Sequence, residues 1–222
     1  MCNHTKSLFL LCLMALFLLP LCDKDKNNAI HIEGKIYDPN SVSFVSGASV
    51  TIAASKLSSG GIFSSGYEDI GTTTSDGDGT FIFDFTEEKF GGYQIRVEKS
   101  QYYSTVKDVA TSEITPGITF SPTYNIYPVC HINLKIRNAV PFDTNDYVFY
   151  SFTSGYLNGS GCCGNTMMEG HGLYYSDSIL CKTHGNQNVT LTYNVRKEGT
   201  IVIHTKTLYC NAFDTTFFNI DY

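Results

Sequence analysis

Cysteine and histidine side chains gather in one short part of the second half of the chain. The segments GCCGNTMMEGHG and CKTHG contain Cys162, Cys163, His171, Cys181 and His184. Thiolate sulfur and imidazole nitrogen are the ligands that zinc prefers, often with paired ligands two to four residues apart. Cys181 and His184 have this spacing, whereas the adjacent Cys162 and Cys163 would point apart on an extended chain. A zinc site that uses His171, Cys181 and His184 is therefore one alternative for this region.

A cysteine nucleophile with a histidine base is a second alternative for the same segment. Cys163 or Cys181 would attack, and His171 or His184 would accept the proton. Neither cysteine lies at a helix start or in a known catalytic signature, and the chain has no Gly-x-Ser-x-Gly, His-Glu-x-x-His or Gly-rich phosphate motif. The sequence therefore predicts a non-enzyme with no catalytic residue, metal site or cofactor. A metal- or thiol-dependent hydrolase at residues 162–184 remains the alternative.

Disulfide bonds are the preferred interpretation of the cysteines in the second half. The candidates are Cys130, Cys162, Cys163, Cys181 and Cys210. Disulfides persist in exported proteins. Because the number of candidate cysteines is odd, at least one thiol stays unpaired or forms a bond between chains. Spacing does not determine the pairing. One arrangement joins Cys181 to Cys162 or Cys163 and Cys130 to Cys210, each bridge stabilising the fold by about 2–4 kcal/mol.

The stretch TTTSDGDGTFIFDF, residues 72–85, is the feature of the first half that most resembles an ion site. Counted from Asp76, a calcium loop would place Asp78, Thr80 and Glu87 at ligand positions three, five and twelve. Position six must be glycine for the sharp turn, but it is Phe81. Asp and Gly are also the residues that tight hairpin turns require. The sequence therefore predicts a hairpin turn here and no calcium site.

The first 22 residues have the pattern of an export signal. The apolar run LFLLCLMALFLLPLC is shorter than the about 20 residues that span a membrane. It ends at Cys22, directly before the polar segment DKDKNN. This switch resembles the end of a bacterial lipoprotein signal, whose cysteine becomes lipidated, although Leu21 stands where that family has a small residue. We therefore expect a signal segment at residues 1–22, lipidation of Cys22, and a flexible tether at residues 23–28 that attaches the protein to a membrane.

Period-two alternation of apolar residues predicts strands from residue 30 onward. In the first half the residues expected on the buried faces are Ile30, Ile32, Ile36, Ala48, Val50, Ile52, Phe81, Phe83, Phe85, Tyr93, Ile95 and Val97. Gly, Pro, Ser and Asp bound these runs, as they do in antiparallel sandwiches. Residues 55–68 interrupt the pattern as a long Ser- and Gly-rich insertion.

Five segments of the first half occur in the order typical of a known family. They are IEGKIYD, SGASVTI, TTTSDGDGTFIFDF, GGYQIRVEKSQYY and ITPGITFSPTYNIYP. In this order they resemble the carboxypeptidase regulatory-like domains, which have a transthyretin-like seven-stranded sandwich. The resemblance covers residues 29–128 and implies a non-catalytic accessory or binding role.

The second half predicts a further sandwich at residues 129–222, of no recognised family. Its expected strands are VCHINLKIR, DYVFYSFT, GLYYSDSILCKT, NVTLTYNVRKEG, TIVIHTKTLYC and FDTTFFNIDY. The paired tyrosines of QYY (101–103) and LYY (173–175) would each leave one ring facing outward. The predicted fold class is therefore all-β, with two antiparallel β-sandwich domains after the N-terminal signal segment.

These features predict an exported, non-catalytic binding or structural module. We expect it at the cell envelope, attached through its lipid to the periplasmic or outer side of a bacterial membrane. The formal net charge of −6 and the lack of a Lys/Arg cluster argue against nucleic acid as a partner. The expected partner is a protein or a polysaccharide, bound in part through exposed aromatic side chains.

Overall fold

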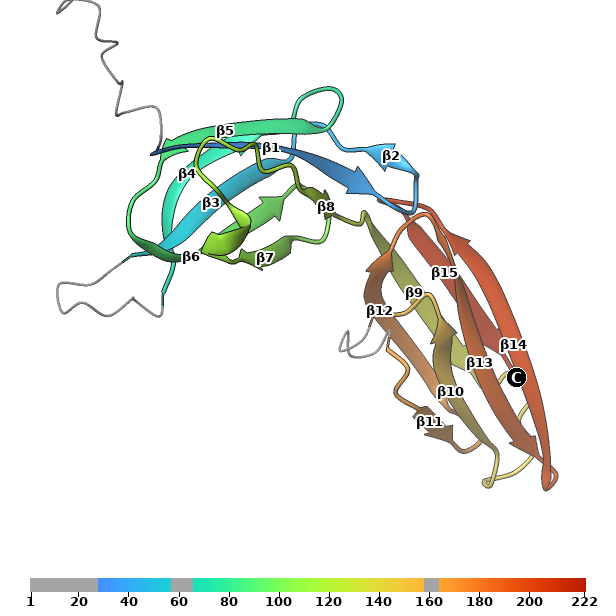
Figure 1. Ribbon diagram of the computed structural model, residues 1–222. Coiled ribbons are helices and arrows are strands. Elements are labelled where there is room, and N and C mark those ends of the chain that lie inside the picture. Colours follow the sequence, from blue (N-terminus) through green and yellow to red (C-terminus); the bar gives the residue numbers. More distant parts are fainter. Residues whose placement is uncertain (1–27, 57–65, 158–163) are drawn as a thin grey trace, which may run out of the picture.

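The computed structural model describes residues 28–56, 66–157 and 164–222. These residues form β-strands joined by turns, with one short 3-10 helix, η3 (Thr111–Glu113), and no α-helix among them. Two β-sandwiches follow each other along the chain and lie end to end at an angle (Figure 1). The predicted all-β class is confirmed. The expected signal segment with Cys22 lies outside the described residues.

The N-terminal sandwich packs two four-stranded sheets face to face. One sheet contains β2 (Ser43–Phe44), β1 (Ala29–Asp38), β5 (Thr80–Thr86) and β8 (Thr123–Asn125). The other contains β4 (Glu68–Thr74), β3 (Ser49–Lys56), β6 (Phe90–Glu98) and β7 (Thr105–Val109). Strand β8 runs parallel to β1, and the remaining neighbours are antiparallel. This parallel pair was not predicted.

The core of this sandwich consists largely of the residues that the alternation of apolar side chains predicts to face inward. All of the predicted inward residues of β1, β3 and β6 are buried, and so is Phe81, while Phe83 and Phe85 pack at its margin. Gly34 of β1 is required by this packing, because a Cβ atom there would lie 2.5 Å from the Phe81 ring. Close packing of this kind leaves no room for even one added methyl group.

The Asp-Gly-Asp-Gly segment is a turn, but the predicted hairpin is wrong. Strand β4 before it and β5 after it belong to different sheets, so the turn carries the chain from one sheet to the other. The Asp76 carboxylate accepts hydrogen bonds from the backbone N–H groups of Asp78 (3.0 Å) and Thr80 (2.8 Å). The buried Ser75 hydroxyl donates to the Val45 carbonyl. Asp76 therefore stabilises the corner through backbone contacts, as Asx turns do.

The C-terminal sandwich packs a four-stranded sheet on a three-stranded one. The larger sheet has the order β11 (Met168–His171), β10 (Tyr147–Ser154), β13 (Gln187–Lys197) and β14 (Thr200–Cys210). The smaller has the order β12 (Ser176–His184), β9 (Val129–Arg137) and β15 (Thr215–Asp221), with β15 parallel to β9. Glu198 and Gly199 form the two-residue turn between β13 and β14, both at positive φ, as tight hairpins require.

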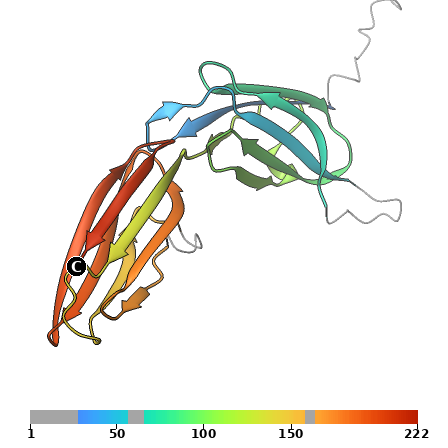
Figure 2. The ribbon, with the colours of Figure 1, turned by 180° about the vertical axis from the view of Figure 1, so that it is seen from behind.

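Each sandwich has its own hydrophobic core. The first core extends from Ile30 to Ile126 and the second from Cys130 to Ile220. Seen from behind, the two sandwiches are separate bodies that meet end to end (Figure 2). The smaller-sheet strand β9 enters the second core directly from the connecting segment, so no long linker separates the two.

Candidate functional site

The histidines and the cysteine proposed as metal ligands do not converge. His171 ends β11 opposite Tyr147 and is exposed, whereas His184 ends β12 opposite Val129. His171 precedes β12 and His184 is its last residue. Because the nine residues of β12 extend about 27 Å, the two histidines lie at opposite ends of the sandwich. Cys181 faces the core between the sheets. The alternative of a zinc site that uses His171, Cys181 and His184 together is therefore wrong. Of the two cysteines in the thiol alternative, Cys163 lies outside the described residues.

His184 instead lies in a cluster of aromatic rings between the two sandwiches. Its imidazole stacks on Tyr127 with ring centroids 4.0 Å apart and planes within 3°, and Tyr103 meets it edge-on at 5.1 Å. Tyr102 packs on Phe213 at 5.3 Å. We call these five residues the joint cluster. Burial lowers the pKa of His184, and the Asp38 carboxylate opposes this shift.

Backbone hydrogen bonds hold the connecting segment on both sides. Tyr103 N–H donates to the carbonyl of Tyr127 (2.9 Å), and the N–H of Val129 donates to the carbonyl of Gln101 (2.8 Å). On the other side, the N–H groups of Gly185 and Phe213 donate to the carbonyls of Pro128 and Val129, each at 2.7 Å. The connection is therefore a hydrogen-bonded strand between two bodies, which opposes free rotation about it.

One side-chain contact also crosses this boundary. The amide of Asn40 donates to the Gly185 carbonyl at 2.7 Å. A Cβ atom at Gly185 would lie 2.5 Å from the backbone of Ala212. Only glycine therefore allows this close approach of the two loops at the base of the C-terminal sandwich.

Two buried thiols lie next to each other just inside the C-terminal core. Cys130 of β9 and Cys210 of β14 come from opposite sheets and are both fully buried free cysteines. Their mutual hydrogen bond lowers the pKa of Cys130 to about 7 against the effect of burial, and that contact together with burial raises the pKa of Cys210. The predicted bridge between them is not formed, although the two residues are neighbours. Cys181 is not among the free thiols, and its predicted partners, Cys162 and Cys163, lie outside the described residues.

A buried polar network organises the loops at the opposite end of the C-terminal sandwich, which we call the tip. The Asp146 carboxylate, 1% exposed, accepts hydrogen bonds from the Phe142 N–H (2.8 Å), the Asp143 N–H (3.3 Å) and the Asn138 amide (2.9 Å). The Lys197 ammonium donates to the Asn138 side-chain oxygen at 2.9 Å. Burial alone would raise the pKa of Asp146, but these donors together lower it. The carboxylate is therefore held ionised beneath the tip.

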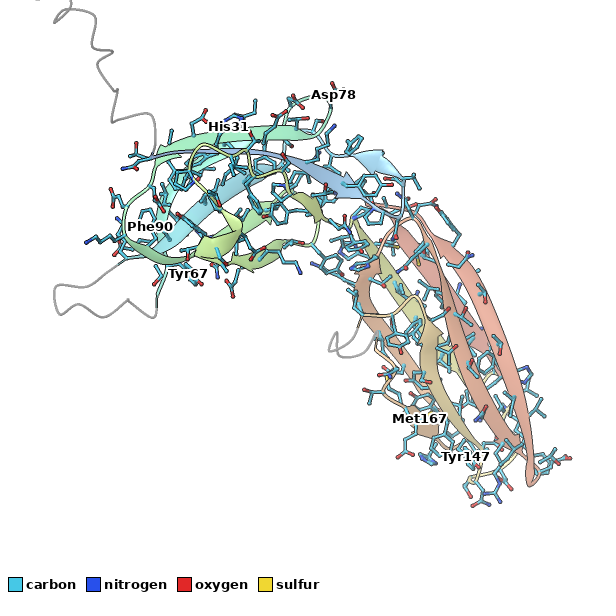
Figure 3. The ribbon with its side chains drawn as sticks, in the orientation of Figure 1. His31, Tyr67, Asp78, Phe90, Tyr147 and Met167 are labelled. Carbon is cyan, nitrogen blue, oxygen red and sulfur yellow. The ribbon has the colours of Figure 1, made fainter. Side chains whose placement is uncertain are left out.

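Large apolar side chains project from the loops that this network fixes. Tyr174 is 88% exposed, Val140 73% and Phe142 54%. The N–H groups of Ala139 and Val140 donate to the terminal Tyr222 carbonyl, at 2.7 and 3.1 Å. Figure 3 places Tyr147, the first residue of β10, at this end of the molecule, remote from the N-terminal sandwich. Fixed loops with exposed apolar side chains are a common form of binding surface.

The tyrosine pairs have different outcomes. In LYY, Tyr174 faces solvent and Tyr175 packs on the core with its hydroxyl 3.1 Å from that of Tyr150, so this prediction is confirmed. In QYY, both Tyr102 and Tyr103 belong to the joint cluster, so the expectation of an outward ring is wrong. The sequence carried no local signal for the joint, because its members come from residues 102–127, 184 and 213.

Within residues 28–56, 66–157 and 164–222, no group of three or more His, Cys, Asp or Glu side chains is placed to hold a metal ion. In that same part of the chain, no helix is long and apolar enough to cross a membrane.

Comparisons with known proteins give similarity to solved structures only. No family model and no curated protein matches the chain. A streptococcal ancillary pilin is 12% identical with a TM-score of 0.35, covering 89% of this chain and 63% of the pilin, so the chain spans less than two thirds of that protein. The shaft pilin SpaA from Lactobacillus rhamnosus GG is 6% identical with a TM-score of 0.32, covering 86% of this chain and 96% of the pilin. A 3-chlorocatechol 1,2-dioxygenase from Rhodococcus opacus 1CP is 11% identical with a TM-score of 0.31, covering 47% of this chain and 60% of the enzyme. With TM-scores below 0.5 and identities of 12% or less, these similarities identify neither a family nor a function for the chain.

Proposed function

We propose that the chain is an exported, lipid-anchored, non-catalytic module that holds the tip of its C-terminal sandwich away from the cell envelope for binding. The observation that carries this proposal is the hydrogen-bonded joint between the two sandwiches. A joint fixed on both sides makes the pair a spacer of defined direction, unlike two domains on a flexible linker. Strand β1 begins at the end of the N-terminal sandwich remote from the joint (Figure 1), so an anchor before it leaves the tip at the far end.

The tip supplies the binding surface of this proposal. Loops fixed by Asp146 lose little conformational entropy when a partner binds, which favours affinity. Val140, Phe142 and Tyr174 offer exposed apolar area with a single phenolic hydroxyl, a composition suited to a protein or a polysaccharide.

The same proposal includes two finer assignments. The N-terminal sandwich would be a carboxypeptidase regulatory-like domain, supported by the five ordered segments and by its two-sheet architecture, although it has eight strands where that family has seven. Cys181 would form a disulfide with Cys162 or Cys163, supported by its absence from the free thiols.

Metabolic labelling with radioactive palmitate tests the anchor. We expect the full chain to incorporate label, Cys22→Ala to lose it, and Cys12→Ala, a cysteine within the apolar run, to retain it. Labelling of Cys22→Ala at the level of the unchanged chain would refute the anchor and with it the envelope location proposed here.

A further inference from the structure

Strand β14 is an unprotected edge of the C-terminal sandwich. It pairs with β13 on one side and with no strand on the other among the described residues. Its eleven residues, TIVIHTKTLYC, contain no acidic residue, proline or register shift. Edge strands are normally blunted by charge, proline, bulges or short length, because their open N–H and C=O groups otherwise pair with another chain.

Exposed apolar side chains follow this edge. On the outer face of the sheet Ile203 is 68% exposed, Ile201 55% and Tyr209 52%. Val202 is 48% exposed even though its pairing partner Val195 is buried in the core. The smaller sheet therefore leaves the inner face of β14 partly uncovered near the start of this strand, at Val202.

The one lysine of the strand does not protect the edge. The Lys206 ammonium turns inward and donates to the backbone carbonyl of Asn219 on β15, at 3.0 Å. It thereby occupies a carbonyl on the neighbouring edge, that of β15. The positive charge of Lys206 therefore lies at β15 and not at the open edge of β14, so the edge of β14 stays free for pairing.

We propose that β14 pairs antiparallel with β14 of a second copy of this chain, with the two-fold axis at Thr205. Side chains that face each other in such a pair must lie on the same face of the sheet, so a two-fold axis must pass through a residue. Thr205 is the middle of Thr200–Cys210, and only this register pairs all eleven residues.

The register also matches apolar with apolar side chains. On the outer face it sets Ile201 opposite Tyr209 of the second copy, and Ile203 opposite Thr207. On the inner face it sets Val202 opposite Leu208, which already packs on the core. Cross-strand pairs of aromatic and β-branched residues are among the most stabilising in sheets. The strand is thus its own best partner, which favours a second copy over an unrelated chain.

The area of this contact sets its strength. Eleven residues extend about 37 Å, and a sheet edge about 10 Å thick then buries on the order of 800 Å² in total. This lies below the range of stable dimers, so the pair forms reversibly at high local concentration. The antiparallel register sets the two N-terminal sandwiches at opposite ends, so the pair joins copies that approach from opposite directions.

Cysteine cross-linking tests the register. On the axis, the Cα atoms of residue 205 in the two copies would lie about 4.5–5.5 Å apart, within reach of a disulfide. Residue 207 in the two copies would lie about 14 Å apart, so Thr207→Cys is the matched control on the same face. With the full chain in detergent at high concentration and mild oxidation, we expect at least fivefold more covalent dimer from Thr205→Cys than from Thr207→Cys. Adding Ile203→Lys should abolish the Thr205→Cys dimer while circular dichroism stays unchanged.

Two results would overturn the proposal. Equal cross-linking of Thr205→Cys and Thr207→Cys would indicate random collision. No cross-linking of either folded variant would show that this edge does not bind a second copy in this register.

Discussion

Removing the Asp146 carboxylate should loosen the tip of the C-terminal sandwich. In Asp146→Ala the Phe142 and Asp143 N–H groups lose their acceptor, and the Asn138 amide keeps only its hydrogen bond to the Gly172 carbonyl. A buried donor left without a partner costs about 1–3 kcal/mol, and less where water can enter. The Asn138 amide is buried, whereas the two backbone donors lie nearer the surface and the Asp143 bond is long. We therefore expect a loss of about 3 kcal/mol in the free energy of unfolding.

Asp143→Ala is the matched control on the same loop. Its carboxylate accepts one exposed hydrogen bond, from the Asn145 N–H at 2.7 Å. The expected loss is only about 0.5 kcal/mol. The chain has no tryptophan, so urea unfolding should be followed by circular dichroism. Hydrogen exchange then locates the change, and we expect the Phe142 amide to exchange faster in Asp146→Ala alone.

The pKa of Asp146 adds a pH signature to the same experiment. Its pKa is lowered in the folded protein, below the value of about 3.9 in an unfolded chain. The unfolded state then binds the proton more readily, so the carboxylate stabilises the fold above about pH 4 and this contribution is lost as pH falls through the folded pKa. The difference between the unchanged chain and Asp146→Ala should therefore shrink in acid. Equal losses in Asp146→Ala and Asp143→Ala at neutral pH would refute the role given to this network.

Two further predictions concern the end of the C-terminal sandwich that meets the joint. Oxidation of the protein should join Cys130 to Cys210. Because the bond would close a loop of about 80 residues, it should raise the free energy of unfolding by up to about 4.5 kcal/mol relative to the reduced protein. Thiol counting before and after dithiothreitol checks this, with Cys210→Ser as the control, and an unchanged midpoint of urea unfolding would contradict it. Burial lowers the pKa of His184, so an undocked joint binds the proton more readily and docking should weaken as pH falls below about 6.5. Small-angle scattering should show that the two sandwiches are less fixed relative to each other at pH 5 than at pH 7.5. His184→Ala should remove this pH dependence, and His171→Ala should keep it. The prediction is contradicted if the scattering profile of the unsubstituted protein is the same at both pH values.

Strand positions were predictable wherever local alternation is strong. The segments VCHINLKIR and TIVIHTKTLYC are β9 and β14 residue for residue. Strand β4 was not predicted, because its residues EDIGTTT contain a glycine and show little alternation. Gly71 is needed there, since a Cβ atom would lie 2.7 Å from the Phe83 ring. The short strands β2, β7, β8 and β11 were also not predicted, because they are defined by the strands they pair with and not by a pattern in their own residues.

The candidate sites were harder to predict than the strands. Proximity in sequence grouped His171 with His184, but an extended strand separates residues by about 3.4 Å each, so sequence neighbours in a sheet need not be neighbours in space. Cys130 and Cys210 are far apart in sequence and lie next to each other. The two thiols come from opposite sheets, so only the packing of one sheet on the other brings them together.

The sequence by itself determined the all-β class, the inward faces of the main strands and the turn at Asp76, because side-chain alternation and backbone preference are local properties. Which sheet each strand joins was decided only by the tertiary structure, so the Asp-Gly-Asp-Gly segment became a corner between sheets. The joint at His184, the network at Asp146 and the open edge at β14 were decided in the same way. Each depends on side chains or strand edges from distant segments, and long-range packing fixes which of these meet and which stay unpaired.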